Sequence, residues 1–268
     1  MNMTYAAHDT LAALRALLVR SNAASGLETA EPIPFGAASL DGPLAGGLPR
    51  AALHEAYAEE GTNDSAAAAG FGLGIALRAS GTRPLVWIRQ DFVDQEAGRL
   101  FGSGLVAFGA EPDRIVLVRV PDQQGAMRAA EEALRCPSLG AVLVEVWGRS
   151  RALDLTATRR LGFAAGRSGV PCLLVRLAAA PAPSAAMTRW SVSAAPSRPL
   201  EANAPGPPAF ALALLRHRAG IAGGTWHVEW DRDRLTFADP APLSRPVVSL
   251  PAGREAGAGG NGRWLRAG

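Results

Sequence analysis

Between Leu53 and Leu177, short apolar runs alternate with longer segments whose apolar residues recur at helical spacing. The apolar runs cover residues 53–57, 85–89, 115–120, 141–147 and 172–177. The helical patterns cover residues 65–79, 94–109, 122–135 and 154–168. Strands that are apolar throughout and alternate with amphipathic helices are typical of a parallel sheet covered on both faces. The pattern therefore predicts an α/β fold, a three-layer αβα sandwich around a mostly parallel central sheet.

Several side chains indicate where these helices begin and which face they bury. An aspartate before a helix can accept hydrogen bonds from its first free N–H groups, so we expect N-caps at Asp94, Asp122 and Asp154. Pro137 is expected to close the third helix. Two apolar stripes are expected to face the core, namely Met127, Ala130 and Leu134 in one helix, and Leu155, Thr158, Leu161 and Ala165 in the next.

After Leu177 the composition changes to alanine, proline and serine, with one strand-like run at 188–193. Three more short strand-like runs follow, at 210–216, 225–230 and 235–237. Glycines separate the first two of these runs, and an Asp-Arg-Asp-Arg turn separates the last two. Short strands joined by such turns predict an antiparallel C-terminal extension of the sheet.

The two ends of the chain differ from this core, and we expect the divisions 1–32, 33–250 and 251–268. The first would hold an amphipathic helix and a linker, with Leu11, Leu14, Leu17 and Leu18 on one helical face. That face either covers a core edge or docks on a partner. The last would be a flexible, glycine-rich tail ending in Arg263, Trp264, Leu265 and Arg266. Its tryptophan either anchors a partner or folds back onto its own domain.

Composition narrows the functional classes. Hydrophobic residues make up 48% of the 268 residues, yet no apolar run approaches the ~18 residues of a membrane span. No secretion signal is evident, and the two cysteines and four histidines follow no metal-ligand spacing. A cytoplasmic protein without a metal or a membrane anchor is expected. The net charge of +3 permits contact with DNA without requiring it, because an arginine-rich solvated surface would give the same balance.

The strand–turn–helix at 53–79 has the layout of a phosphate-binding P-loop. That loop needs two glycines, a lysine for the outer phosphates and a hydroxyl. Here Ala58 and Asn63 occupy the glycine positions, Asp64 the lysine position and Ser65 the hydroxyl position. All 27 basic residues of the chain are arginine, so no lysine elsewhere can replace the missing one. The pattern indicates a degenerate nucleotide site with no cofactor.

Several segments before this loop and two later ones carry a further signal. They are Ile33-Pro34-Phe35-Gly36, Ser39-Leu40-Asp41, Leu44-Ala45-Gly46-Gly47-Leu48-Pro49-Arg50, Leu53-His54-Glu55, the run from Trp190 to Ser197, and Trp226-His227-Val228-Glu229-Trp230. These segments resemble the RecA-type ATPase core, and within it the ImuA family. The resemblance implies a RecA-like accessory protein of SOS mutagenesis without catalytic residues of its own. Its partners would be ImuB, an inactive relative of Y-family polymerases, and an error-prone polymerase, with RecA and further copies of the chain as additional candidates.

The same resemblance marks two acidic residues. RecA-type ATPases carry a carboxylate after the second core strand to activate water, and an aspartate at the end of a later strand for magnesium. By position these correspond to Asp91 and Glu145. Since Asp64 takes the place of the lysine, we interpret Asp91 as a loop or cap residue and Glu145 as a strand-end residue paired with an arginine.

Two other functions fit parts of the pattern. A SulA-like inhibitor of cell division would also be RecA-like without a nucleotide site, and a divergent RecA-like ATPase would hold phosphate through its backbone and arginines. A dinucleotide-binding enzyme fits poorly, because the glycines of Gly70-Phe71-Gly72-Leu73-Gly74 fall inside the predicted helix instead of at its start. We expect those glycines to allow close helix packing.

Overall fold

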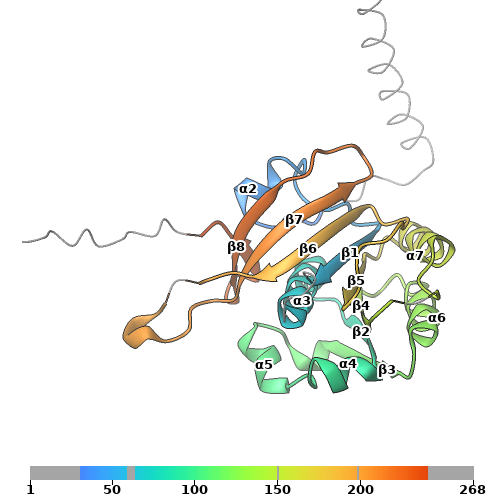
Figure 1. Ribbon diagram of the computed structural model, residues 1–268, viewed down its shortest axis with the longest axis horizontal. Coiled ribbons are helices and arrows are strands. Elements are labelled where there is room, and N and C mark those ends of the chain that lie inside the picture. The colour runs from blue at the N-terminus through green and yellow to red at the C-terminus, as the bar shows by residue number, and fades with distance from the viewer. Residues whose placement is uncertain (1–30, 59–63, 150, 198, 241–268) are drawn as a thin grey trace, which may run out of the picture.

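The computed structural model describes residues 31–58, 64–149, 151–197 and 199–240. Within these residues one mixed sheet has the strand order β3-β2-β4-β5-β1-β6-β7-β8-β9 (Figure 1). Its strands are β1 (Leu53–Ala58), β2 (Leu85–Gln90), β3 (Ile115–Val120), β4 (Ala141–Trp147), β5 (Cys172–Leu177), β6 (Thr188–Ala194), β7 (Ala209–His217), β8 (Thr225–Asp231) and β9 (Thr236–Ala238). The six strands from β3 to β6 in this order are parallel, and β6 to β9 are antiparallel. The predicted antiparallel extension is confirmed.

The helices lie on both faces of the sheet, as Figure 1 shows for α3 on one side and α6 and α7 on the other. Their bounds are α2 (Ala38–Asp41), α3 (Ser65–Ser80), α4 (Asp91–Glu96), α5 (Gly102–Ala107), α6 (Gln123–Ala133) and α7 (Leu155–Ser168), with short 3-10 helices at Pro112–Arg114 and Glu201–Asn203. The predicted α/β architecture is confirmed, and it is consistent with a RecA-like fold. No helix in the described ranges is long and apolar enough to cross a membrane.

Each face of the sheet has its own hydrophobic core. The core under α3 is rich in aromatic residues, and Phe237 packs against Phe71 and Trp230 with ring centroids 5.6 and 4.9 Å apart. The core under α6 and α7 is aliphatic, built from residues such as Val144 and Leu161. Because both faces are covered, β1, β2, β4 and β5 are buried along almost their whole length, which explains why the sequence lacks a two-residue alternation there.

Glycines in α3 let this helix pack closely on the sheet, as predicted. A β-carbon at Gly72 would lie 2.8 Å from Val175 Cγ2, and one at Gly74 would lie 2.7 Å from Phe237 Cζ. Real β-carbons do not approach other atoms so closely. The glycine run is therefore explained by packing in the middle of a helix.

One predicted helix is wrong. Residues 94–109 form no continuous helix, because α4 ends at Glu96 and α5 begins only at Gly102. Gly98, with φ of +83°, lies in the break, in the left-handed region that glycine adopts readily. Asp94 is consequently no N-cap: it lies inside α4, and its carboxylate pairs with arginines.

The other helix signals are largely confirmed. The carboxylates of Asp122 and Asp154 accept hydrogen bonds from the N–H groups of Gly125 and Ala157, over 2.6 and 2.7 Å, and so cap α6 and α7. The stripe in α6 is buried as expected. In α7 the prediction fails for Leu155, which is 39% exposed because it is the first residue of the helix and lies beyond the sheet-facing turns.

Candidate functional site

The carboxyl ends of β1, β2 and β4 and the start of α3 meet at one edge of the sheet. A cavity of about 190 Å³ lies between α3, α5 and the ends of β2 and β4, and it is lined by Ser65, Arg89 and Glu145 together with residues of α3, α5 and the loop before α5. Ligand pockets usually enclose ~300–1,000 Å³, so this cavity is small for a nucleotide. Ala58 is buried at the end of β1, and Asn63 lies outside the described residues.

Asp64, at the lysine position of the P-loop pattern, makes a structural contact. Its Oδ1 accepts a hydrogen bond from the backbone N–H of Ala194 over 2.9 Å, and its side chain makes no capping bond to its own helix. This bond ties the start of α3 to the last residue of β6. Ser65 is the first residue of the helix and lines the small cavity.

Glu145 is held by a buried arginine on the neighbouring strand. Arg89 Nε lies 2.7 Å from Glu145 Oε2, and the two side chains are only 5% and 2% exposed. A second nitrogen of Arg89 contacts Asp94 Oδ1. Burial raises the pKa of Glu145 above its usual value, and the ion pair with Arg89 opposes that rise. Glu145 is therefore engaged by an arginine, whereas the corresponding carboxylate of an ATPase would be free to hold magnesium.

Asp91 begins α4 and is likewise engaged. Arg119 Nη2 lies 2.9 Å from Asp91 Oδ1 and 3.0 Å from Asp94 Oδ2, so this arginine joins two carboxylates. Sequence reasoning missed both Arg89 and Arg119. The available signal was a charged residue in each otherwise apolar strand, β2 and β3, but its partner depends on strand order.

Three of the segments that resemble the RecA-type core are joined by a chain of hydrogen bonds that starts at Trp190, passes through His54 and ends at Pro49. Trp190 Nε1 donates to Thr188 Oγ1 over 2.9 Å, and Thr188 Oγ1 lies 2.7 Å from His54 Nδ1. The other ring nitrogen, Nε2, lies 2.8 Å from the Pro49 carbonyl oxygen. Since a carbonyl only accepts, Nε2 carries the proton and Nδ1 accepts from the threonine. Burial lowers the pKa of His54 to about 4, so the ring is neutral at pH 7.

The neighbouring Glu55 organises the opposite face of β1. Its Oε2 accepts from Ser184 Oγ over 2.6 Å and from Tyr57 Oη and Arg189 Nε, each over 3.3 Å. Arg176 Nη1 donates to the same tyrosine oxygen over 2.9 Å. Glu55 and Arg176 are buried, and these contacts fix β1 between β5 and β6. Sequence reasoning did not single out the two arginines or the serine.

The glycines before β1 also have a structural reason. Gly47 has φ of +129°, and a β-carbon there would lie 2.1 Å from the Ile33 carbonyl oxygen. This close approach lets Ile33 and Leu48 exchange two backbone hydrogen bonds, over 2.7 and 2.9 Å. Arg50 then donates to the Ala79 carbonyl at the end of α3, over 2.7 Å.

The residues predicted to bind partners lie outside the described residues: Leu11, Leu14, Leu18, Arg263, Trp264, Leu265 and Arg266. The same holds for Leu17 and for the rest of the predicted terminal divisions. Among the described residues, no group of three or more His, Cys, Asp or Glu side chains is placed to hold a metal ion.

The chain is similar in sequence to known ImuA proteins. The chain is 31% identical to the Protein ImuA of Caulobacter vibrioides strain NA1000 / CB15N over 224 residues, covering 75% of this chain and 84% of that protein. The Protein ImuA of Caulobacter vibrioides strain ATCC 19089 / CIP 103742 / CB 15 matches with the same identity and coverage. No family model matches the chain.

Proposed function

Because the chain belongs to the ImuA family, we propose that it is a non-enzymatic, RecA-like accessory protein of damage-induced mutagenic translesion DNA synthesis. Its partners would be an ImuB-like protein and an error-prone polymerase. It would recruit or position these proteins without turning over a nucleotide. Membership of the family supports the process, and the geometry at the edge of the sheet supports the absence of catalysis.

The contact between Asp64 and Ala194 carries the non-enzymatic part of the proposal. A lysine at this position would attract the outer phosphates, whereas a carboxylate repels them. Losing one charge-assisted contact costs ~1.5–3 kcal/mol, which weakens binding about tenfold or more before any repulsion is counted. The carboxylate also accepts a structural hydrogen bond from Ala194, so it stabilises the fold without any bound nucleotide.

The acidic residues at the same edge support this interpretation. A RecA-type ATPase needs one carboxylate free to activate water and another to hold magnesium. Glu145 is buried against Arg89, and Asp91 pairs with Arg119. Two arginine-bound carboxylates and a cavity of about 190 Å³ suit a closed structural network better than a hydrolytic centre.

The chain ends supply the proposed contacts. The leucine face of residues 8–21 would dock on RecA-like neighbours or on further copies of this chain, and Trp264 with its flanking arginines would anchor the ImuB-like protein. The leucine contact is testable with a chain that begins at Ile33. Loss of RecA binding or of self-association supports docking through this face, and unchanged mass and binding would make residues 8–21 structural.

The whole proposal is testable in cells. Tagged protein is purified after DNA damage and its partners are identified by mass spectrometry, with undamaged cells as the control. We expect an ImuB-like protein and an error-prone polymerase, and a lower frequency of damage-induced mutation in a deletion strain. Recovery of a cell-division protein, with filamentous growth on overexpression, would instead support a SulA-like inhibitor. ATP hydrolysis that depends on Asp91 or Glu145 would support a divergent ATPase.

A further inference from the structure

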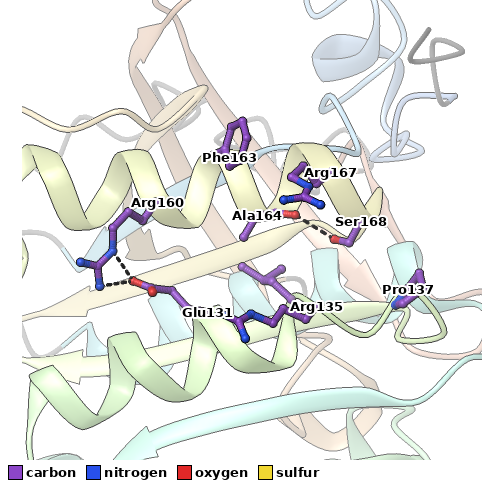
Figure 2. Close-up of a pocket in the computed structure, with 9 residues that line it drawn as sticks. Glu131, Arg135, Pro137, Arg160, Phe163, Ala164, Arg167 and Ser168 are labelled. Atoms are coloured by element: carbon purple, nitrogen blue, oxygen red, sulfur yellow. Dashed lines mark hydrogen bonds and ion pairs between the residues drawn. The ribbon is translucent and has the colours of Figure 1, made fainter.

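A groove runs between α6 and α7, on the face of the sheet opposite α3 and its small cavity. It encloses about 490 Å³, which is within the ~300–1,000 Å³ typical of ligand pockets. Figure 2 shows the two helices side by side, with the Arg160–Glu131 pair joining them and with Pro137 and Ser168 farther along. The site described above uses none of these residues.

The groove combines an apolar floor with an exposed aromatic ring. Leu134 is buried at its base, while Phe163, from the outer face of α7, is 69% exposed. Phe163 follows the exposed Arg159 and Arg160 by about one helical turn, so the ring interrupts a charged surface. A large apolar side chain beside a concave, polar-rimmed surface is typical of an interaction site.

The charge of the groove is positive, because three arginines (Arg135, Arg160 and Arg167) line it against one carboxylate, Glu131. Arg160 already holds Glu131, with Nε and Nη2 lying 2.8 and 2.6 Å from Oε1. The other two are more available. Arg135 makes only an exposed surface pair with Glu132, a kind of contact worth little, and Arg167 forms no ion pair within the described part of the chain. Its guanidinium lies 5.9 Å from the centre of the Phe163 ring.

We infer that this groove binds an acidic segment of a partner protein that carries an apolar side chain. The apolar side chain packs on the exposed ring of Phe163, and carboxylates of the segment pair with Arg135 and Arg167. The planar guanidinium fork matches a carboxylate well. Glu131 disfavours a nucleic acid, because a phosphodiester backbone carries negative charge along its whole length. A peptide can instead place an apolar residue beside Glu131. The inference does not depend on the proposed role in mutagenesis.

The test uses the full chain and a fluorescein-labelled peptide in which Asp and Glu flank a Leu-Phe pair, followed by fluorescence anisotropy. We expect saturable binding that weakens as salt rises. Phe163→Ala should weaken it about tenfold, and Arg135→Glu combined with Arg167→Glu should do at least as much. Replacing the Leu-Phe pair of the peptide by serines should have an effect similar to that of Phe163→Ala.

Matched controls separate the groove from the rest of the surface. Phe101→Ala removes a ring that is 72% exposed but lies on α5's side of the sheet, and Arg232→Glu reverses an exposed charge in the turn between β8 and β9, outside the groove. Both should bind the peptide as the unchanged protein does. Thermal unfolding of every variant should show that the fold is retained, since the altered side chains are exposed.

The exposed thiol of Cys136, between Arg135 and Pro137, allows binding to be located directly. Cys172 is buried, so an environment-sensitive fluorophore should label Cys136 selectively. Its emission should change when the peptide binds. Absence of saturable binding, equal losses in the control variants, or a silent fluorophore would each overturn the inference. Binding of a single-stranded oligonucleotide that depends on Phe163 and Arg167, without peptide binding, would make the groove a nucleic-acid site and overturn it as well.

Discussion

Arg89 and Glu145 form a buried ion pair between the adjacent strands β2 and β4, with Nε 2.7 Å from Oε2. The pair lies at the edge of the sheet where a RecA-type ATPase would hold its metal and its water. In this protein the positive charge beside Glu145 is the guanidinium of Arg89. The same pair is therefore important for stability, since neither side chain can reach water to replace its partner.

Removing Glu145 should destabilise the fold strongly. Glu145→Ala leaves the Arg89 charge buried with only Asp94 to balance it, and breaking a buried pair in this way costs about 3 kcal/mol or more. Urea unfolding gives the change in free energy. Glu132→Ala, which removes one partner of an exposed pair with Arg135, is the control and should cost less than about 1 kcal/mol. Equal losses in the two variants would contradict the prediction.

Stability should fall in mild acid because His54 must remain neutral. The unfolded state binds a proton near pH 6.5, whereas burial lowers the pKa of His54 in the folded state to about 4. The stabilisation is therefore complete above pH 6.5 and is lost progressively as the pH falls to 4, by about 3 kcal/mol in total. His54→Gln should have a flatter profile in this window when unfolding is measured against pH. A profile with the unchanged slope would show that other groups cause it.

Two glycine-to-alanine changes should have opposite effects on the stability of the fold. Gly74→Ala places a methyl group 2.7 Å from Phe237 Cζ, and such overpacking costs about 1–3 kcal/mol despite the better helix propensity of alanine. Gly162→Ala in α7 meets nothing closer than Leu53 Cβ at 3.9 Å, so it should stabilise by about 0.5–1 kcal/mol. Melting temperatures of both variants test the pair. Stabilisation by Gly74→Ala would contradict the packing explanation of this glycine.

ATP should bind negligibly, because Asp64 replaces the lysine and no other lysine exists in the chain. Titration of a fluorescent ATP analogue with magnesium measures this. Saturable binding in the low-micromolar range would refute a degenerate site, provided that Asp64→Ala alters it. Binding that Asp64→Ala leaves unchanged would place the nucleotide elsewhere.

The tail should contribute to the affinity for an ImuB-like partner. Replacing a buried aromatic anchor costs more than ~2 kcal/mol, so Trp264→Ala should weaken binding about thirtyfold. A chain ending at Gly253 should lose at least as much. Affinities of both variants, measured against the full chain, decide the question. Unchanged values would move the partner surface onto the folded core.

Much of the fold could be predicted from the sequence because the physical signals are local. Runs such as 141–147 are apolar at every position except Glu145 and buried almost throughout, which is typical of a strand covered on both faces. Asp122 and Asp154 cap helices through hydrogen bonds to N–H groups only three residues further along the chain. The predicted helix at 94–109 failed because its apolar spacing continues across Gly98, where the backbone turns into the left-handed region.

The site and the groove depend on contacts that are distant in the chain. Asp64 meets Ala194 only because β6 lies beside β1, and Glu145 meets Arg89 only because β4 lies beside β2. The sequence shows a charged residue inside each apolar strand but does not identify its partner. Likewise, the arginines of the α6–α7 groove look like an ordinary solvated surface until the two helices are placed side by side.

The position of β1 between β5 and β6 has a consequence for synthesis of the chain on the ribosome. Leu53 is the first residue of β1, the first strand among the described residues, yet it pairs with Cys172, and the next residue, His54, pairs with Thr188. When β1 leaves the exit tunnel, neither neighbour has been made. Its backbone groups must wait through the translation of β2, β3 and β4, and productive folding is delayed until late in elongation. During this interval a nascent chain would expose β1 with two unpaired edges, the kind of exposed edge that chaperones protect during folding.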